Sequence, residues 1–461
     1  MSTDRPARST GSERETDAEP TTGFDDRAPL LDVDGLKKHF PVNTGFIDSI
    51  RFDTDRGGVP FYFDDTSVKA VDGVSFSLEP GETFGVVGES GCGKSTLART
   101  ILGLEEPTAG RIRFDGRPVE EIPDAEFHER SQMVFQDPQS SLNSRRKVGH
   151  IIEDPLEGSG WEKDRRRERA LELLEAVGLK REYYNRYPHE FSGGQRQRIN
   201  LARALSINPD LVVADEPVSG LDVSVQAKIL NLMDRLQDEF GLTYLLISHN
   251  LSVVRYIADR VAVMYVGDFV EVADADQLFA EQYHPYAKAL LGAVPNPDPD
   301  KPGVRSDIEG QVPSASDPPR GCKFHTRCPE FILPDGFDSR AVYDGYVTLL
   351  EDLRNGRIEG DASDPGTIVD GYLPGRDGLD SAIGREIERG VEQALDDEWE
   401  RAIETVSTYE SVCQRTVPDL EPIDGERRRA ACHLWGDSGS AERDGLAFPA
   451  ENSTDDGGES R

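Results

Sequence analysis

Short apolar runs alternate with amphipathic stretches from Leu31 to about Val294. The apolar runs predict buried β-strands, at Thr83–Val87, Gln132–Phe135, Leu211–Ala214 and Thr243–Ile247. Stretches whose apolar residues recur every three or four positions predict α-helices, at Lys94–Leu104, Arg166–Val177, Gly193–Leu205 and Val225–Phe240. Regular alternation of strands and helices is typical of an α/β layered domain, which we place at residues 29–294.

Polar segments divide the rest of the chain. Residues 1–28 and 437–461 have hardly any apolar content, which predicts a disordered arm and a disordered tail. Residues 295–319 are rich in Pro and Asp and predict a linker, followed by a smaller cysteine-containing region at 320–436. No apolar run approaches membrane-spanning length, and the N-terminus does not look like a signal peptide, so we expect a soluble or peripheral, cytoplasmic protein.

Within the cysteine-containing region, residues 331–409 form an acidic insertion. Its apolar residues recur at a helical step of four, at Ile383, Ile387, Val391, Leu395, Trp399 and Ile403. This single stripe predicts a helix that packs on the C-terminal core.

The chain is strongly acidic, with 87 Asp and Glu against 52 Lys and Arg and a formal net charge of −35. Phosphate backbones bind basic surfaces, so the charge argues against a nucleic-acid partner. A carboxylate-covered surface stays solvated in concentrated salt. We therefore favour adaptation to a salt-rich cytosol, of the haloarchaeal kind, over an acidic interaction surface.

A phosphate-binding loop follows the first predicted buried strand. Gly88 to Thr96 reads Gly-Glu-Ser-Gly-Cys-Gly-Lys-Ser-Thr and fits the pattern G-x-x-x-x-G-K-[ST] between a strand and a helix. Backbone N–H groups of such a loop wrap phosphate oxygens. We expect Lys94 to reach the β- and γ-phosphates and Ser95 to ligate Mg²⁺. The predicted nucleotide-binding residues here are Gly88, Glu89, Ser90, Gly91, Cys92, Gly93, Lys94, Ser95 and Thr96.

Two carboxylates end the predicted strand in Leu211-Val-Val-Ala-Asp-Glu-Pro217. Parallel strands present their carboxyl ends to the ligand crevice, so Asp215 and Glu216 should emerge near the phosphate loop. Asp215 would bind Mg²⁺, and Glu216 would orient and deprotonate the attacking water. Taken alone, the segment could also be a strand capped by acidic turn residues.

Phe191-Ser-Gly-Gly-Gln-Arg-Gln-Arg198 lies between these two motifs and opens a predicted helix, with Ser192 as a good N-cap. With this segment the chain resembles the ATP-binding cassette (ABC) ATPases, whose signature is S-G-G-Q. The resemblance implies a RecA-like core, an antiparallel β subdomain and a helical signature subdomain. It also implies a function for Gln136 near Mg²⁺ and the γ-phosphate, for Asp222 in the loop Ser219-Gly-Leu-Asp, and for His249 as the γ-phosphate sensor. Phe40 is our choice for the residue that stacks on adenine, next to an insertion with other aromatics at 61–63; an ordinary core aromatic is the alternative.

The resemblance further implies that two cassettes pair head to tail around two ATP molecules. Each ATP would lie between the phosphate loop of one subunit and the signature of the other, Ser192, Gly193, Gly194 and Gln195. ATP would stabilise the closed dimer, and hydrolysis would let it open. Glu216, His249, Gln136 and Lys94 are all present, so we expect a catalytically competent ATPase.

Three segments are similar to the oligopeptide and dipeptide importer branch of that family. They are Lys37-Lys-His-Phe-Pro-Val, Val134-Phe-Gln-Asp-Pro-Gln-Ser-Ser-Leu-Asn143 and His284-Pro-Tyr-Ala-Lys-Ala-Leu-Leu-Gly-Ala-Val-Pro295. The similarity implies a peripheral subunit at the cytoplasmic face of the membrane. Its partners would be two membrane permeases, an external solute-binding protein, and a paralogous ATPase or a second copy of itself. Nickel or sugar import is the alternative within this branch. An exporter ATPase, or a non-transport ABC ATPase in DNA repair or on the ribosome, is the alternative outside it.

Four cysteines follow the cassette, at Cys322, Cys328, Cys413 and Cys432, whereas Cys92 belongs to the phosphate loop. Four thiolates suit Zn²⁺ or an iron–sulfur cluster, and their spacing matches neither the usual zinc-finger nor the ferredoxin pattern. Four thiols without any ligand are a further alternative, and a disulfide is the least favoured one in a reducing cytosol. Some peptide importers end in a similar Gly-Cys…Arg-Cys-Pro…Cys…Ala-Cys-His pattern, and that resemblance implies a [4Fe–4S] cluster. The pattern leaves open whether His325, Arg327 and His433 support the ligands or lie on the surface.

Overall fold

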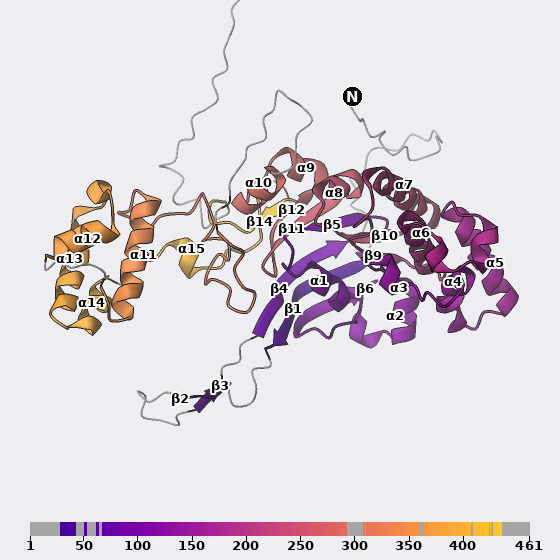
Figure 1. Ribbon diagram of the computed structural model, residues 1–461, viewed down its shortest axis with the longest axis horizontal. Helices are drawn as coiled ribbons and strands as arrows, with labels where there is room; N and C mark the ends of the chain where they lie inside the picture. Colours follow the sequence, from indigo (N-terminus) through magenta and orange to yellow (C-terminus); the bar gives the residue numbers. More distant parts are fainter. Residues whose placement is uncertain are drawn as a thin grey trace, which may run out of the picture.

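The computed structural model describes residues 28–42, 50–52, 61–63, 67–292, 308, 310–358, 364–406, 409–423, 425 and 427–435 (Figure 1). The predicted tail, the arm apart from Ala28, and much of the predicted linker lie outside these residues. No helix in these ranges combines the length and the apolarity needed to cross a membrane.

Within the described residues, eight strands form the main sheet, in the order β13-β14-β12-β11-β5-β10-β9-β8, of which the first three are β13 (Glu421–Pro422), β14 (Arg429–Ala430) and β12 (Asp268–Asp274). Neighbours from β11 to β8 run parallel, and they are β11 (Arg260–Tyr265), β5 (Thr83–Val87), β10 (Thr243–Ile247), β9 (Leu211–Asp215) and β8 (Ser131–Val134). Every residue of β5, β9 and β10 is buried, as their unbroken apolar runs predict. The parallel order brings the carboxyl ends of β5, β9 and β10 to one edge of the sheet.

A second, antiparallel sheet packs beside the first, in the order β4-β1-β6-β7. Its strands are β4 (Ser67–Leu78), β1 (Leu31–Pro41), β6 (Ala109–Phe114) and β7 (Arg117–Pro118), and a separate hairpin pairs β2 (Ile50–Phe52) with β3 (Phe61–Phe63). Phe76 of β4 stacks on Phe84 of β5 with ring centroids 4.8 Å apart, in an apolar cluster that also takes in residues of α1 (Lys94–Ile101). This is the antiparallel subdomain that the resemblance to ABC ATPases implies.

The cassette helices cover the main sheet, and some of them lie beyond one end of it (Figure 1). A helical part consists of α3 (Pro138–Ser141), α4 (Val148–Glu157), α5 (Lys163–Ala176) and α6 (Gly193–Ala204). The remaining helices are α2 (Asp124–Arg130), α7 (Val223–Phe240), α8 (Leu251–Ile257), α9 (Ala275–Ala280) and α10 (Pro285–Gly292). All four predicted helices are present. The first ends three residues early at Ile101, because Gly103 adopts the left-handed conformation.

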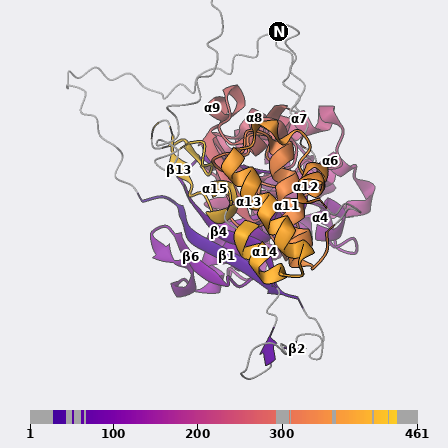
Figure 2. The ribbon, with the colours of Figure 1, turned by 90° about the vertical axis from the view of Figure 1, so that its left-hand side faces the viewer.

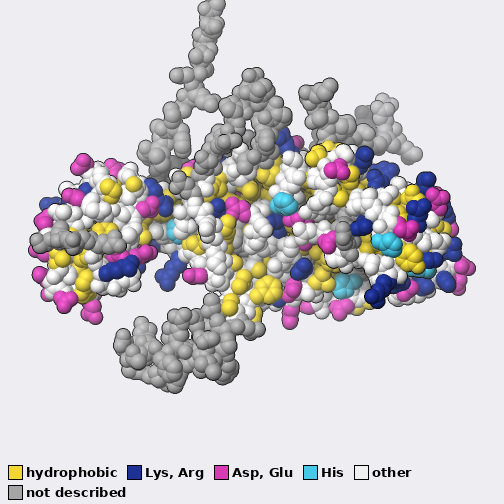
Figure 3. All heavy atoms as spheres, in the orientation of Figure 1, with side chains coloured by type: hydrophobic (Ala, Val, Ile, Leu, Met, Phe, Trp, Pro, Cys, Tyr) yellow, Lys and Arg dark blue, Asp and Glu magenta, His cyan; other side chains and the backbone are white. Residues whose placement is uncertain are grey.

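The acidic insertion differs from its prediction. The expected single helix is two helices, α13 (Ser381–Leu395) and α14 (Trp399–Val406), because the chain turns between them with Asp397 at a φ of 70°. Together with α11 (Arg340–Arg354) and α12 (Pro365–Tyr372) they enclose a hydrophobic cluster of their own, including Leu349, Ile387 and Val391. The insertion is therefore a helical unit with its own core, which extends from the cassette in Figure 1 and faces the viewer in Figure 2. Its acidic side chains are spread over the surface seen in Figure 3.

The expected separate C-terminal cysteine domain is not confirmed. Cys322 and Cys328 pack against the hydrophobic cluster of the cassette itself. After the insertion, α15 (Val412–Arg415) leads to β13 (Glu421–Pro422) and β14 (Arg429–Ala430). β14 pairs with β12 (Asp268–Asp274), and β13 pairs with β14 as the edge strand of the main sheet. Part of the predicted linker also docks, since the backbone N–H of Lys69 donates to the carbonyl of Ala315 at 2.8 Å.

Candidate functional site

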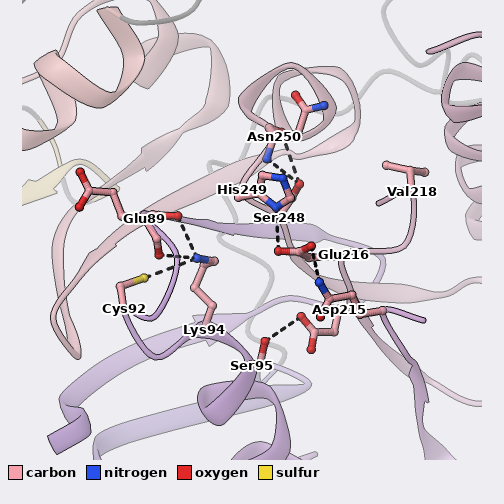
Figure 4. Close-up of polar contacts among 12 residues, drawn as sticks. Glu89, Cys92, Lys94, Ser95, Asp215, Glu216, Val218, Ser248, His249 and Asn250 are labelled. Atoms are coloured by element: carbon pink, nitrogen blue, oxygen red, sulfur yellow. Dashed lines mark hydrogen bonds and ion pairs between the residues drawn. The ribbon is translucent and has the colours of Figure 1, made fainter. Parts of the chain in front are cut away.

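The phosphate-binding loop lies between β5 and α1 and is shaped by close backbone contacts. Gly93 has a φ of 110°, and a Cβ there would lie 1.9 Å from the carbonyl oxygen of Ala70 on β4, so only glycine fits. The Lys94 Nζ donates to the carbonyl oxygens of Gly88 and Glu89, at 2.8 Å each, and lies 3.6 Å from the Cys92 Sγ (Figure 4). The ammonium thus lies inside the loop where phosphate oxygens would bind.

Two oxygen ligands for a divalent cation meet beside this loop. The Ser95 hydroxyl, at the start of α1, donates to the Asp215 Oδ1, at the end of β9, at 3.1 Å. Burial raises the pKa of Asp215, and the charge of Glu216 adds to the rise, while the Ser95 hydrogen bond opposes it. A buried carboxylate next to a hydroxyl offers the hard oxygen ligands that Mg²⁺ prefers, and a cation would stabilise its charge. These residues fit the Mg²⁺ that the sequence predicts.

Glu216 is held between two of the other predicted residues. Its Oε2 accepts from the Gln136 Nε2 at 2.7 Å, and its Oε1 lies 2.7 Å from the His249 Nδ1. Its backbone has a φ of 47°, a rare conformation for a non-glycine residue, and its N–H donates to the Ile247 carbonyl of β10 at 2.8 Å. This turn points the carboxylate toward the space in front of Lys94 (Figure 4). The arrangement can orient a water molecule and take a proton from it.

The signature residues lie apart from this cluster. Ser192 caps α6 with a reciprocal capping box, in which the Gln195 N–H donates to the Ser192 Oγ at 3.4 Å and the Ser192 N–H donates to the Gln195 Oε1 at 3.0 Å. Ser192 and Gly193 are exposed, and Gly194 packs near Val225 of α7. Asp222 caps α7 by accepting from the Val225 N–H at 3.0 Å. An exposed capped helix end is suited to bind an anion presented by another subunit.

Phe40 lies at the end of β1, opposite Val68 of β4, and is half-buried. The Lys38 ammonium lies 4.7 Å from the centroid of its ring. Its contact with adenine stays a prediction. The neighbouring aromatics at 61–63 lie on β3, and their side chains are outside what the structure describes.

The four late cysteines are free thiols from three chain segments that converge. The Cys322 N–H donates to the Cys413 carbonyl at 2.8 Å, and Gly321, with a φ of 67°, lets the two segments touch, because a Cβ there would lie 2.4 Å from that carbonyl. Burial raises the pKa of Cys322 to about 11 and that of Cys432 to about 12, and neighbouring thiols contribute to both. Among the described residues, no three His, Cys, Asp or Glu side chains converge closely enough to hold one metal ion.

Two contacts with the phosphate loop could not be predicted from the sequence. The Glu89 N–H donates to the Tyr286 hydroxyl of α10 at 3.0 Å, and the Glu89 carboxylate pairs with Arg327 at 3.2 Å. Arg327 therefore contacts the phosphate loop rather than the surface or the thiols. His325 and His433 hydrogen-bond to backbone carbonyls of Cys322 and Thr416, at 2.8 and 2.9 Å. No motif could have revealed the two contacts of Glu89, because Tyr286 and Arg327 lie 197 and 238 positions from it in the sequence.

Comparison with known proteins matches three families along the chain. The ABC transporter family matches residues 71–219, and the C-terminal region of oligopeptide/dipeptide transporters matches residues 270–331. A domain of unknown function, DUF8228, matches residues 338–426 and so includes the helical unit. The dipeptide transport ATP-binding protein DppF of Escherichia coli is 51% identical over 304 residues, covering 65% of this chain and 86% of that protein. The oligopeptide transport ATP-binding protein AppF of Bacillus subtilis is 49% identical over 307 residues, covering 65% of this chain and 89% of that protein.

Proposed function

This chain belongs to the ABC transporter ATP-binding proteins of the oligopeptide/dipeptide type, and from that premise we propose how its residues divide the work. The protein is an ATPase, and its hydrolysis of ATP powers peptide import by an ABC transporter. One observation carries the residue assignment. The carboxylate of Glu216 lies between Gln136 and His249, next to the Asp215–Ser95 pair and in front of Lys94.

We assign Glu216 as the general base. Because Gln136 and His249 each hold one of its carboxylate oxygens, the carboxylate is oriented before nucleotide binds, so little reorganisation is needed. A water molecule in front of Glu216 would give up its proton to this carboxylate as it attacks the γ-phosphorus, and the bond from that phosphorus to the bridging oxygen would break and release ADP. His249 and Gln136 would then contact the γ-phosphate and register its loss.

Lys94 exchanges its contacts when nucleotide binds. Its ammonium now donates to the carbonyls of Gly88 and Glu89, and the phosphate oxygens would take over these hydrogen bonds. Ser95 and Asp215 would hold Mg²⁺, with Gln136 close to it. When bound, this ion neutralises charge on the phosphate oxygens.

The exposed signature supports a dimer. Ser192 and Gly193 are exposed, and Gly194 and Gln195 beside them are half-buried, which suits contact with a nucleotide held by another cassette. That cassette would be a paralogous subunit or a second copy of this chain. We place the pair at the cytoplasmic face of the membrane, beneath two permeases that receive peptide from an external binding protein. Adenine would stack on Phe40, and Asp222 would lie at the dimer seam.

The similar proteins named above are dipeptide and oligopeptide transport proteins, which favours peptides over nickel or sugars as the cargo. Membership of a transporter branch likewise disfavours a non-transport ABC ATPase. The choice among peptides belongs to the permeases and the external binding protein.

For the late cysteines we propose a [4Fe–4S] cluster rather than zinc. A single Zn²⁺ needs its ligands to converge on one point at about 2.3 Å, and the described thiols do not. A cubane cluster has four irons, each of which can take one thiolate, so its ligands stand farther apart. Cys322, Cys328, Cys413 and Cys432 are close enough to raise one another's pKa, and they would hold the cluster in a largely buried site. The acidic surface we attribute to a salt-rich cytosol.

Uptake by the reconstituted transporter tests the function. The complete complex, in vesicles at high salt, should accumulate labelled di- and oligopeptides only when ATP is supplied on the side of this subunit. Labelled nickel and labelled sugar should not accumulate in the same vesicles. Uptake of nickel or sugar with no uptake of peptide would overturn the cargo assignment, and ATP-independent uptake would overturn the coupling.

A further inference from the structure

The loop between Cys322 and Cys328 contacts the phosphate-binding loop directly. The guanidinium of Arg327 donates from Nη1 to the Glu89 Oε2 at 3.2 Å and from Nη2 to the Glu89 Oε1 at 3.4 Å. Its Nη1 also donates to the Tyr265 hydroxyl of β11 at 3.3 Å. Arg327 is only 8% exposed and Glu89 27%, so the pair is shielded from water and salt more than a surface ion pair. Glu89 is thus held at both its carboxylate and its backbone N–H.

Lys323, at the other end of the same loop, supports the phosphate loop by a second route. Its Nζ donates to the Val266 carbonyl and to the Asp72 Oδ2, at 3.0 Å each, and lies 2.8 Å from the Asp268 Oδ2. Asp72 lies on β4, whereas Val266 lies in the turn between β11 and β12 and Asp268 begins β12. In that turn the Gly267 N–H donates to the Cys92 carbonyl of the phosphate loop at 2.9 Å. Lys323 therefore fixes the turn that holds Cys92.

Phe324 anchors the middle of the loop in the cassette. Its side chain is 1% exposed and lies edge-on to Tyr265, with centroids 5.2 Å apart, and 5.5 Å from the ring of Tyr286. Tyr286 in turn accepts from the Glu89 N–H. The Cys322–Cys328 loop therefore binds the cassette through one aromatic side chain and two cations of its own, and their partners lie in or beside the phosphate-binding loop.

We propose that the loop from Cys322 to Cys328 is a positioning element for the phosphate-binding loop, and that Arg327 sets nucleotide affinity by fixing Glu89. Arg327 is a positioning residue, because its guanidinium bonds to the side chains of Glu89 and Tyr265 and acts on the phosphate-binding loop through Glu89. The Lys94 ammonium bonds to the carbonyl of Glu89, so release of Glu89 loosens the cradle that Lys94 completes. Displacement of this loop, as by loss of its two terminal thiols, weakens ATP binding in the same way. This inference rests on the proposed function.

Arg327→Gln and Glu89→Gln, made separately and together in the assembled transporter, test the proposal. Each single change should raise the KM for ATP and the Kd of a fluorescent ATP analogue roughly two- to fivefold, as expected for an ion pair that is still partly exposed, with kcat within about twofold of the parent. The double variant should be no worse than either single one, because both remove the same contact. Arg327→Lys, which keeps the charge, should restore part of the affinity.

Lys288→Gln is the matched control. It removes a cation of the same region, which pairs with Glu330 at 2.9 Å and does not contact the phosphate loop, and it should leave the KM unchanged. If the parent hydrolyses ATP and both Gln variants keep the parental KM and Kd, the inference is wrong while the proposed function stands. If the parent neither binds nor hydrolyses ATP, the proposed function itself fails. If Arg327→Gln does not fold, Glu89→Gln and its Kd decide, because that change leaves the cysteine loop intact.

Discussion

Replacing Glu216 with glutamine separates the chemistry of the site from its architecture. The two side chains have the same shape, but the amide has only one accepting oxygen and no charge. Glu216 now accepts from Gln136 at 2.7 Å and lies 2.7 Å from the His249 Nδ1, so in Glu216→Gln one of these two contacts must reverse its direction or be lost. The ligands of the phosphate and of Mg²⁺, Lys94, Ser95 and Asp215, are not changed.

The structure indicates a small cost in stability and a large cost in rate. His249 is 58% exposed and Glu216 15%, so the lost pair contributes about 1 kcal/mol or less to folding. Loss of a positioned general base lowers a rate roughly 10²- to 10⁴-fold. We therefore expect Glu216→Gln to bind ATP with nearly parental affinity, to lose turnover, and to accumulate in the ATP-bound dimer.

Phosphate release, ATP-analogue binding and size-exclusion chromatography, at high salt with the partner subunit, measure these three properties. Glu216→Asp is the matched control, because it keeps the carboxylate and shortens its reach, and it should retain more activity than Glu216→Gln. A turnover of Glu216→Gln within threefold of the parent would refute the assignment of this residue as the base.

Three further predictions follow from other parts of the fold. Replacing residues 337–408 with a short Gly/Ser linker should leave ATP hydrolysis unchanged, because the helical unit has its own core. The Ser411 Oγ lies 2.5 Å from the Ile332 carbonyl, so the two ends of the replaced segment are already close together. Loss of hydrolysis would contradict this. Burial lowers the pKa of His284 to about 3, against about 6.5 unfolded, so its stabilising effect is complete above pH 6.5 and is lost as the pH falls toward 3. From pH 7 to pH 5 the free energy of unfolding of the parent should therefore fall by about 2 kcal/mol more than that of His284→Asn, whose amide oxygen can still accept from the Tyr286 N–H. Thermal melting at the two pH values measures this, and an equal fall in melting temperature for the two proteins would contradict it. Anaerobically purified protein should contain iron and sulfide in equal amounts and little zinc, and a colourless protein without iron would exclude the cluster.

The sequence predicts the local parts of the site well. The spacing of Gly88, Gly93, Lys94 and Ser95 after a buried strand is a local pattern, and the structure has the strand, loop and helix in that order. The meeting of Asp215 with Ser95 also follows from strand order, because β9 and β5 flank β10 in a parallel sheet. Periodicity and the chemistry of adjacent residues are sufficient for such features.

The remaining features depend on long-range packing. Arg327 and Glu89 are separated by 238 positions, and nothing beside either residue indicates its partner. The apolar stripe of the insertion continues at a step of four across 396–398, so its period could not reveal the turn that divides α13 from α14. Likewise, β14 is only two residues long, and its place in the main sheet comes from pairing with β12 on one side and β13 on the other.

The central claim is that this cassette holds Mg²⁺-bound ATP at Lys94, Ser95 and Asp215 and splits it at Glu216. The most direct measurement is phosphate release from ATP by the purified chain with its partner subunit in high salt, with and without a magnesium chelator. The account predicts steady turnover that the chelator abolishes. Failure to retain ATP or release phosphate in the presence of Mg²⁺, or equal turnover in its absence, would contradict it.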